Sequence, residues 1–113
     1  MSAKFEIKKA ADGSFYFHLM AANGQIILAS QMYTAKSSAE NGVESVKANA
    51  QLDERYERKS DIDGKPFFVL KAANDQVIGK SEMYASPAKM EEGIESVRKN
   101  APNAAIADLA SAG

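Results

Sequence analysis

Apolar and polar residues alternate in short segments near the start of the chain. Residues 5–8 alternate strictly, and residues 15–21 and 25–30 are rich in aromatic and branched apolar side chains. Such patterns are typical of half-buried strands. Glycine-containing pairs at 12–13 and 23–24 separate these segments and are hairpin signals, because glycine readily adopts the positive φ of tight turns. We therefore predict three strands joined by two hairpins.

The apolar spacing then changes to that of a helix, over residues 36–49 and again over residues 87–100. The apolar positions are Ala39, Val43 and Val46 in the first segment and Met90, Ile94 and Val97 in the second. Ser86, followed by a proline, predicts an N-cap for the second helix. Ser37 begins a capping-box sequence, which suggests a similar start for the first helix.

The whole pattern occurs twice. Shifting the chain by about 51 residues places residues 5–50 on residues 56–101 without a gap, with roughly 20 of about 46 pairs identical. Such internal identity indicates a duplicated and fused unit. We predict one α+β domain over residues 1–113, made of one repeat at 5–55 and a second at 56–109.

Strand alternation also predicts which side chains face the helices. The predicted core positions are Phe5, Ile7, Phe17, Leu19 and Ile27 in the first repeat and Phe68, Leu70 and Ile78 in the second. The opposite face would carry Tyr16, His18, Met20, Ile26 and Leu28, together with Phe67, Val69, Lys71 and Val77. This face is more apolar than a solvated surface, so it is either partly covered within the molecule or an interaction surface.

Short motifs in the second repeat, each with a partner in the first, resemble the YegP-like family of small bacterial proteins. The motifs are Ala72-Ala73-Asn74, Ser81-Glu82-Met83-Tyr84-Ala85 and Gly93-Ile94-Glu95-Ser96-Val97. The resemblance covers nearly the whole chain. It brings no activity, substrate or cofactor with it.

What the resemblance implies is an architecture of two β(3)-α-β units. They would share one antiparallel sheet, with both helices on one face and the strand after each helix exchanged to the other unit. Those strands would be residues 53–59 and residues 105–109, the latter returning to the edge near Phe5. Residues 104–110 have poor β propensity, so a frayed helix or tail is the alternative there, and residues 110–113 are expected to be a disordered tail.

Composition narrows the function classes. The 113 residues contain no cysteine, which excludes disulfides and thiolate chemistry and suits a cytoplasmic protein. No apolar run is long enough to span a membrane. The formal net charge is −1 with both signs interspersed, so a nucleic-acid partner is not expected.

Residues with catalytic potential are few. His18 is the single histidine, and the second repeat has Val69 in its place, so a sheet-face role is favoured over a general base. Gly79-Lys80-Ser81 lacks the first glycine of a phosphate loop. We therefore assign no catalytic, metal or cofactor site.

Two function hypotheses remain. The first is a binding module that uses the helix-free face to contact a protein partner or a second copy, as a monomer or weak homodimer. The second is a small-molecule binder or hydrolase at the strand–helix junctions near Tyr33 and Tyr84, where polar residues recur in both repeats. The absence of a titratable constellation favours the first.

Overall fold

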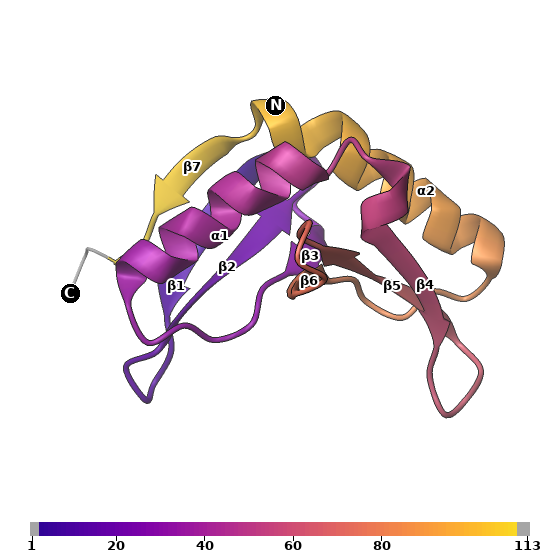
Figure 1. Cartoon of the computed structure of the whole chain (residues 1–113), viewed down its shortest axis with the longest axis horizontal. Coiled ribbons are helices and arrows are strands. Elements are labelled where there is room, and N and C mark those ends of the chain that lie inside the picture. The colour runs from indigo at the N-terminus through magenta and orange to yellow at the C-terminus, as the bar shows by residue number, and fades with distance from the viewer. Residues whose placement is uncertain (1–2, 111–113) are drawn as a thin grey trace.

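The computed structural model describes residues 3–110, which form seven strands and two helices (Figure 1). The strands are β1 (Lys4–Lys9), β2 (Phe15–Met20), β3 (Ile26–Ala29), β4 (Tyr56–Ser60), β5 (Pro66–Lys71), β6 (Val77–Lys80) and β7 (Ala105–Asp108), and the helices are α1 (Lys36–Asn49) and α2 (Pro87–Asn100). Both helices have the predicted bounds. They lie on the same side of the sheet in Figure 1.

All seven strands belong to one sheet, in the order β4-β5-β6-β3-β2-β1-β7. The two repeats meet at its centre, where β3 pairs with β6 at Ala29 and Lys80. Five of the six neighbouring pairs are antiparallel, but β7 runs parallel to β1, with Ile106 beside Phe5. The prediction of a purely antiparallel sheet was therefore wrong at this edge. A strand reached through a helix, as β7 is, can run parallel to its neighbour, whereas a strand joined by a tight hairpin cannot.

The segments that follow the two helices differ. Asp53–Arg55 forms a 3₁₀ turn, whose carbonyl at Asp53 accepts a hydrogen bond from the amide of Tyr56. The strand predicted over residues 53–59 therefore begins only at Tyr56. After α2, a second 3₁₀ turn over Ala101–Asn103 leads into β7, so this segment is a strand despite its poor β propensity.

The hairpin turns explain a difference between the repeats. Gly24 has a φ of 86°, and in the second repeat Asp75 takes its place with a φ of 69°. Aspartate is among the residues that tolerate this left-handed region. In each turn the backbone amide of this residue donates a hydrogen bond to the carbonyl of the residue three positions earlier. Gly24 donates to Ala21, and Asp75 donates to Ala72.

The helix starts also differ. The Ser86 hydroxyl accepts a hydrogen bond of 3.2 Å from the Lys89 amide, which confirms the predicted cap. Helix α1 begins after Ala35, which has no side chain able to cap, and Ser37 already lies inside the helix. The capping box predicted at Ser37 was therefore wrong.

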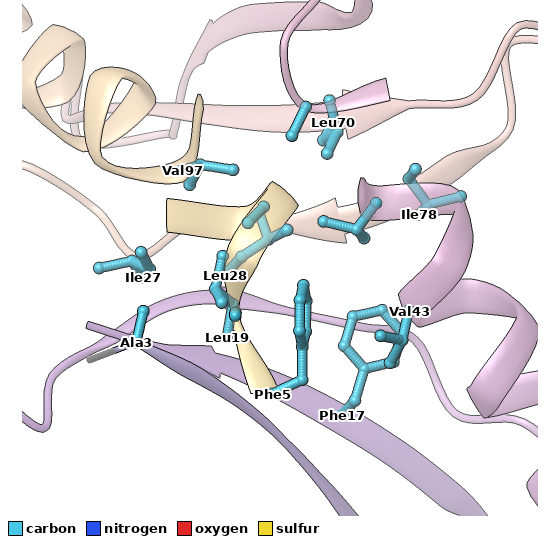
Figure 2. Close-up of a cluster of buried hydrophobic side chains, with 14 of the residues drawn as sticks. Ala3, Phe5, Phe17, Leu19, Ile27, Leu28, Val43, Leu70, Ile78 and Val97 are labelled. Atoms are coloured by element: carbon cyan, nitrogen blue, oxygen red, sulfur yellow. The ribbon is translucent and has the colours of Figure 1, made fainter. Parts of the chain in front are cut away.

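A single hydrophobic cluster lies between the sheet and the helices (Figure 2). All eight core positions predicted from the strands are buried, and Phe5, Phe17 and Phe68 are fully so. The rings of Phe5 and Phe17 pack edge to face, with centroids 6.0 Å apart. Helices α1 and α2 add Val43, Val46 and their counterparts from their apolar stripes.

The predicted disordered tail lies mostly outside the described residues. Ala110, its first residue, packs against the core as a partly buried side chain, so the prediction fails there. Residues 111–113 are not described. No helix within residues 3–110 has the length and apolar character needed to cross a membrane.

Candidate functional site: the helix-free face of the sheet

Every second side chain of the central strands points away from the helices. In β2, Phe17 and Leu19 enter the core, so Tyr16, His18 and Met20 face the other way. We call this surface the helix-free face. The strand register adds further members: Ile26 beside Met20, Ala29 beside His18, Lys80 beside Ala29, Val77 beside Lys71, and Phe67, Val69 and Lys71 from β5.

Five of the seven side chains predicted for this face are there and are partly exposed. They are Tyr16, His18, Met20, Ile26 and Phe67. Val69 is also there but is buried, at 5% exposure, between Glu57 of β4 and Lys80 of β6. Both neighbours have long side chains, which can cover a valine with their aliphatic parts.

The seventh residue, Leu28, was assigned to the wrong face. It is 1% exposed and lies in the core cluster with Leu19, its partner in the neighbouring strand (Figure 2). The register shifts after this pair, so Met20 faces Ile26 and Ile27 is the extra residue of a β-bulge. A bulge breaks the alternation from which the prediction was made.

The core position of Leu28 depends on a glycine in the other repeat. A methyl group on Gly79 would lie 2.6 Å from Leu28 side-chain atoms, so the leucine occupies the space that a side chain there would need. Positions 28 and 79 are equivalent in the two repeats. At the junction between the repeats, the leucine side chain of one repeat therefore fills the space that the glycine of the other repeat leaves empty.

Two ion clusters, each centred on one of the equivalent glutamates Glu6 and Glu57, lie on the outer strands of this face. Glu6 accepts from Lys4 at 3.2 Å and from Lys8 at 3.6 Å. In the second repeat, Glu57 lies 2.5 Å from Lys71 and 4.0 Å from Lys59. The hydrogen bond from a lysine is the main reason that the pKa of each carboxyl is lowered. Each cluster therefore holds one carboxylate between two ammonium groups.

His18 lies between these clusters as a neutral ring. Burial lowers its pKa, and the nearby charge of Lys8 lowers it further, whereas Glu6 acts in the opposite direction. Its Nδ1 is buried and has no hydrogen-bond partner within residues 3–110, and its ring centroid is 5.2 Å from that of Tyr16. The described chain contains no group of three or more His, Cys, Asp or Glu side chains that could hold a metal ion.

The sheet is only narrowly joined at its centre. Beside the single β3–β6 pair lies a hollow of about 260 Å³, lined by Ala29, Ser30, Gln31, Val77, Gly79 and Lys80. The ammonium group of Lys80 lies 5.0 Å from the centroid of the Phe67 ring, within the range of a cation–π contact. A cation and an aromatic ring are thus adjacent at the middle of the helix-free face.

The strand–helix junctions hold the residues of the alternative hypothesis. Tyr33 stacks on Phe17 and Tyr84 on Phe68, with ring centroids 6.4 and 6.2 Å apart. A cleft of about 280 Å³ beside Tyr84 is lined in part by Asn23, Gln25, Glu82, Lys89, Glu92 and Ser96. Burial raises the pKa of both tyrosines, and the charge of Glu82 adds to the effect at Tyr84. Neither hydroxyl is therefore prepared to exchange a proton near pH 7.

The distribution of the lysines was not predicted from the sequence. The net charge of the whole chain is close to zero, whereas alternation in the strands places Lys4, Lys8 and Lys59 on the same face as Lys71 and Lys80. The signal was available in the sequence, because these lysines occupy the polar positions of alternating strands.

Comparisons with known proteins agree with the resemblance seen in the sequence. The profile of the family described as "Domain of unknown function (DUF1508)" matches residues 10–57 and 61–108, one match in each repeat. The chain is 53% identical to UPF0339 protein PA0329 of Pseudomonas aeruginosa over 108 residues, which cover 96% of this chain and 98% of that protein. It is 47% identical to UPF0339 protein YegP of Escherichia coli K12, with the same coverage.

Two solved structures have the same fold. The solution NMR structure of UPF0339 protein SO3888 from Shewanella oneidensis matches with a TM-score of 0.93 and 45% identity, covering 99% of this chain and 95% of that one. The solution NMR structure of the E. coli protein of unknown function yegP gives the same score and identity, covering 100% and 97%. The predicted YegP-like resemblance is therefore confirmed.

Proposed function

Since the chain belongs to the DUF1508 family, whose description carries no activity, we propose a function from the geometry alone: a non-catalytic binding module that uses the helix-free face. The observation that supports this proposal is that Tyr16, Met20, Ile26 and Phe67 remain partly exposed on the central strands of the sheet, on the side opposite both helices. Partly exposed apolar side chains gathered on one face of a sheet are characteristic of interaction sites.

The surroundings of these side chains suit binding rather than catalysis. The lysine–glutamate clusters lie on the outer strands, beside these apolar side chains, as polar groups border the core of an interface. The pKa of His18 is lowered by burial, and its neighbours Glu6 and Lys8 are already paired with each other. The residues opposite this imidazole in the two neighbouring strands of the described sheet are Glu6 and Ala29, so neither supplies a serine, threonine or cysteine nucleophile.

We also propose that the fold evolved by exchange of strands between two units. Strand β4 follows the helix of the first repeat and opens the second, while β7 follows the helix of the second repeat and pairs with the opening strand of the first. Both pairings support this reading of the architecture.

The proposal can be tested by affinity capture with matched variants. Wild type, a Tyr16→Glu/Phe67→Glu variant and a Tyr33→Phe/Tyr84→Phe variant would be immobilised and exposed to a lysate of E. coli K12, which contains a relative. We expect the glutamate variant to lose the retained material, because it places two charges among the apolar side chains of the helix-free face. We expect the phenylalanine variant to keep it.

Thermal unfolding of all three proteins first establishes that the variants are folded. Equal retention by all three folded proteins would refute the helix-free face as the binding site. Loss of retention in the phenylalanine variant alone would favour the small-molecule site near Tyr84.

A further inference from the structure

The charge of the helix-free face differs from that of the chain. Within residues 3–110, its strand positions carry five lysines and two glutamates, a surplus of three positive charges, although the whole chain has a formal net charge of −1. The lysines are Lys4, Lys8, Lys59, Lys71 and Lys80, and the glutamates are Glu6 and Glu57. The rest of the molecule is correspondingly acidic.

The internal ion pairs do not neutralise this surface. Each carboxylate is shared by two ammonium groups, which leaves one positive charge at the β1 cluster, while the charge of Asp75 near Lys71 offsets part of the surplus at the β4–β5 cluster. The central Lys80 contacts the Phe67 ring and has no ion pair within the described residues. An anionic partner could therefore meet cations at three places across the sheet: at β1, at β6 and at the β4–β5 pair.

Aromatic rings lie between these cations. Tyr16 is on β2 and Phe67 is on β5, with β3 and β6 between them, so the two strands are roughly 14 Å apart at the usual strand spacing. The register places the two residues on opposite sides of the central row that contains Ala29 and Lys80, so the rings are further apart than the strands. Both rings are partly exposed, and His18 adds a third flat ring next to Tyr16. Exposed rings on a sheet face act as stacking platforms for unpaired bases, and spaced cations contact the phosphates.

We propose that the helix-free face binds single-stranded nucleic acid, with bases stacked on Tyr16 and Phe67 and phosphates at the flanking lysines. This deepens, and rests on, the proposed binding function. An acidic peptide would use the lysines and leave the rings without a purpose, and a purely apolar partner would leave the charge surplus uncompensated. The expectation against nucleic acid was based on the net charge of the chain, which does not describe this face.

The test is fluorescence anisotropy with labelled oligouridylate and oligothymidylate, in low and in near-physiological salt. Wild type is compared with Tyr16→Ala, Phe67→Ala and Lys80→Ala, and with Lys99→Ala, which removes an exposed lysine from the last turn of α2. We expect each ring variant to raise Kd roughly five-fold or more. We expect Lys80→Ala to reduce the slope of log K against log salt by about 0.7, and Lys99→Ala to change neither quantity.

Three results would overturn the proposal. One is the absence of binding at about 100 μM protein, the weak end of non-specific association. Another is equal weakening by Lys99→Ala and Lys80→Ala. A third is binding to polyglutamate as tight as to the oligonucleotides. If oligonucleotides do not bind, but the Tyr16→Glu/Phe67→Glu variant still loses its captured material, the binding function stands and the nucleic-acid assignment falls.

Discussion

Two helical glycines show how single residues determine the helix–sheet distance. Gly42 and Gly93 occupy equivalent, buried positions in α1 and α2, where glycine normally costs about 1 kcal/mol relative to alanine. A methyl group on Gly93 would come within 2.1 Å of the Tyr84 hydroxyl oxygen, and one on Gly42 within 2.8 Å of Tyr33 and Phe17 atoms. The glycines therefore allow each tyrosine to lie directly against its helix.

Gly93→Ala is accordingly expected to destabilise the protein by about 1–2 kcal/mol, because overpacking against Tyr84 outweighs the gain in helix propensity. Combining it with Tyr84→Phe removes the oxygen closest to the new methyl group, so the double variant should lose less than the sum of the two single variants. Denaturant unfolding of the four proteins measures this coupling. Additive losses, or a stabilised Gly93→Ala variant, would show that α2 is free to move away from the ring.

At this scale, the sequence predicts side chains well wherever strand alternation is unbroken. Phe5, Phe17 and Phe68 were assigned correctly from period alone. Leu28 was not, because the bulge at Ile27 depends on hydrogen bonding between two strands and has no local signature. The sequence shows that leucine and glycine occupy the equivalent positions 28 and 79. It does not show that these two residues contact each other, which is the reason for the difference.

Strands β1 and β4 hold equivalent positions in the two repeats, but only β4 lies at an edge of the sheet. In β1, the side chain of Ile7 is buried in the core, while its carbonyl points towards β7 and accepts a hydrogen bond of 2.9 Å from the amide of Leu109, just after that strand. In β4, Arg58 is the equivalent residue. Its partner Phe68 directs its own amide and carbonyl towards Ser81, so the Arg58 backbone groups point away from the sheet, and β4 is the terminal strand.

Amide hydrogen exchange should therefore separate these two residues. We expect the Arg58 amide to exchange at least about a hundred-fold faster than the Ile7 amide, since it lies on an open edge and needs no unfolding to meet water. Nuclear magnetic resonance exchange rates on dilute protein measure both. A slow Arg58 amide whose protection is lost on dilution would instead indicate that a second copy covers β4.

The charged side chains of β4 fit this open position. Glu57, Arg58 and Lys59 are consecutive on the edge, and charges of this kind discourage another strand from pairing there. Arg58 is held by Glu91 of α2 at 2.6 Å and by Asp53 at 3.1 Å.

The helices and hairpins could be predicted as elements because their signals are local. The strand β7 depends on a partner some hundred residues away in sequence, and its own residues give almost no signal.

Over the whole molecule, neither repeat has a complete core of its own. Helix α1 contacts β5 and β6 of the second repeat, α2 contacts β3 of the first, and β7 covers the edge of β1. One cluster of buried side chains runs through both halves. The duplication could be predicted from sequence identity between the halves, but this dependence could not, because it arises from contacts that cross between them.

Cutting the chain between residues 52 and 53 tests that dependence. The fragment 1–52 lacks β7 and the β5–β6 surface that supports α1, so its core side chains, Phe5 and Ile7 among them, would be left partly exposed. The fragment 53–113 keeps β7 but has no β1 for it to pair with. Chains of this length are also near the lower limit for an independent core.

We therefore expect neither fragment to unfold cooperatively when unfolding is followed by circular dichroism. We expect an equimolar mixture to regain a cooperative transition, because together the fragments supply all contacts that cross between the repeats. Cooperative unfolding of either fragment alone would mean that a single repeat is a sufficient folding unit, with the shared core added after each half had already become stable.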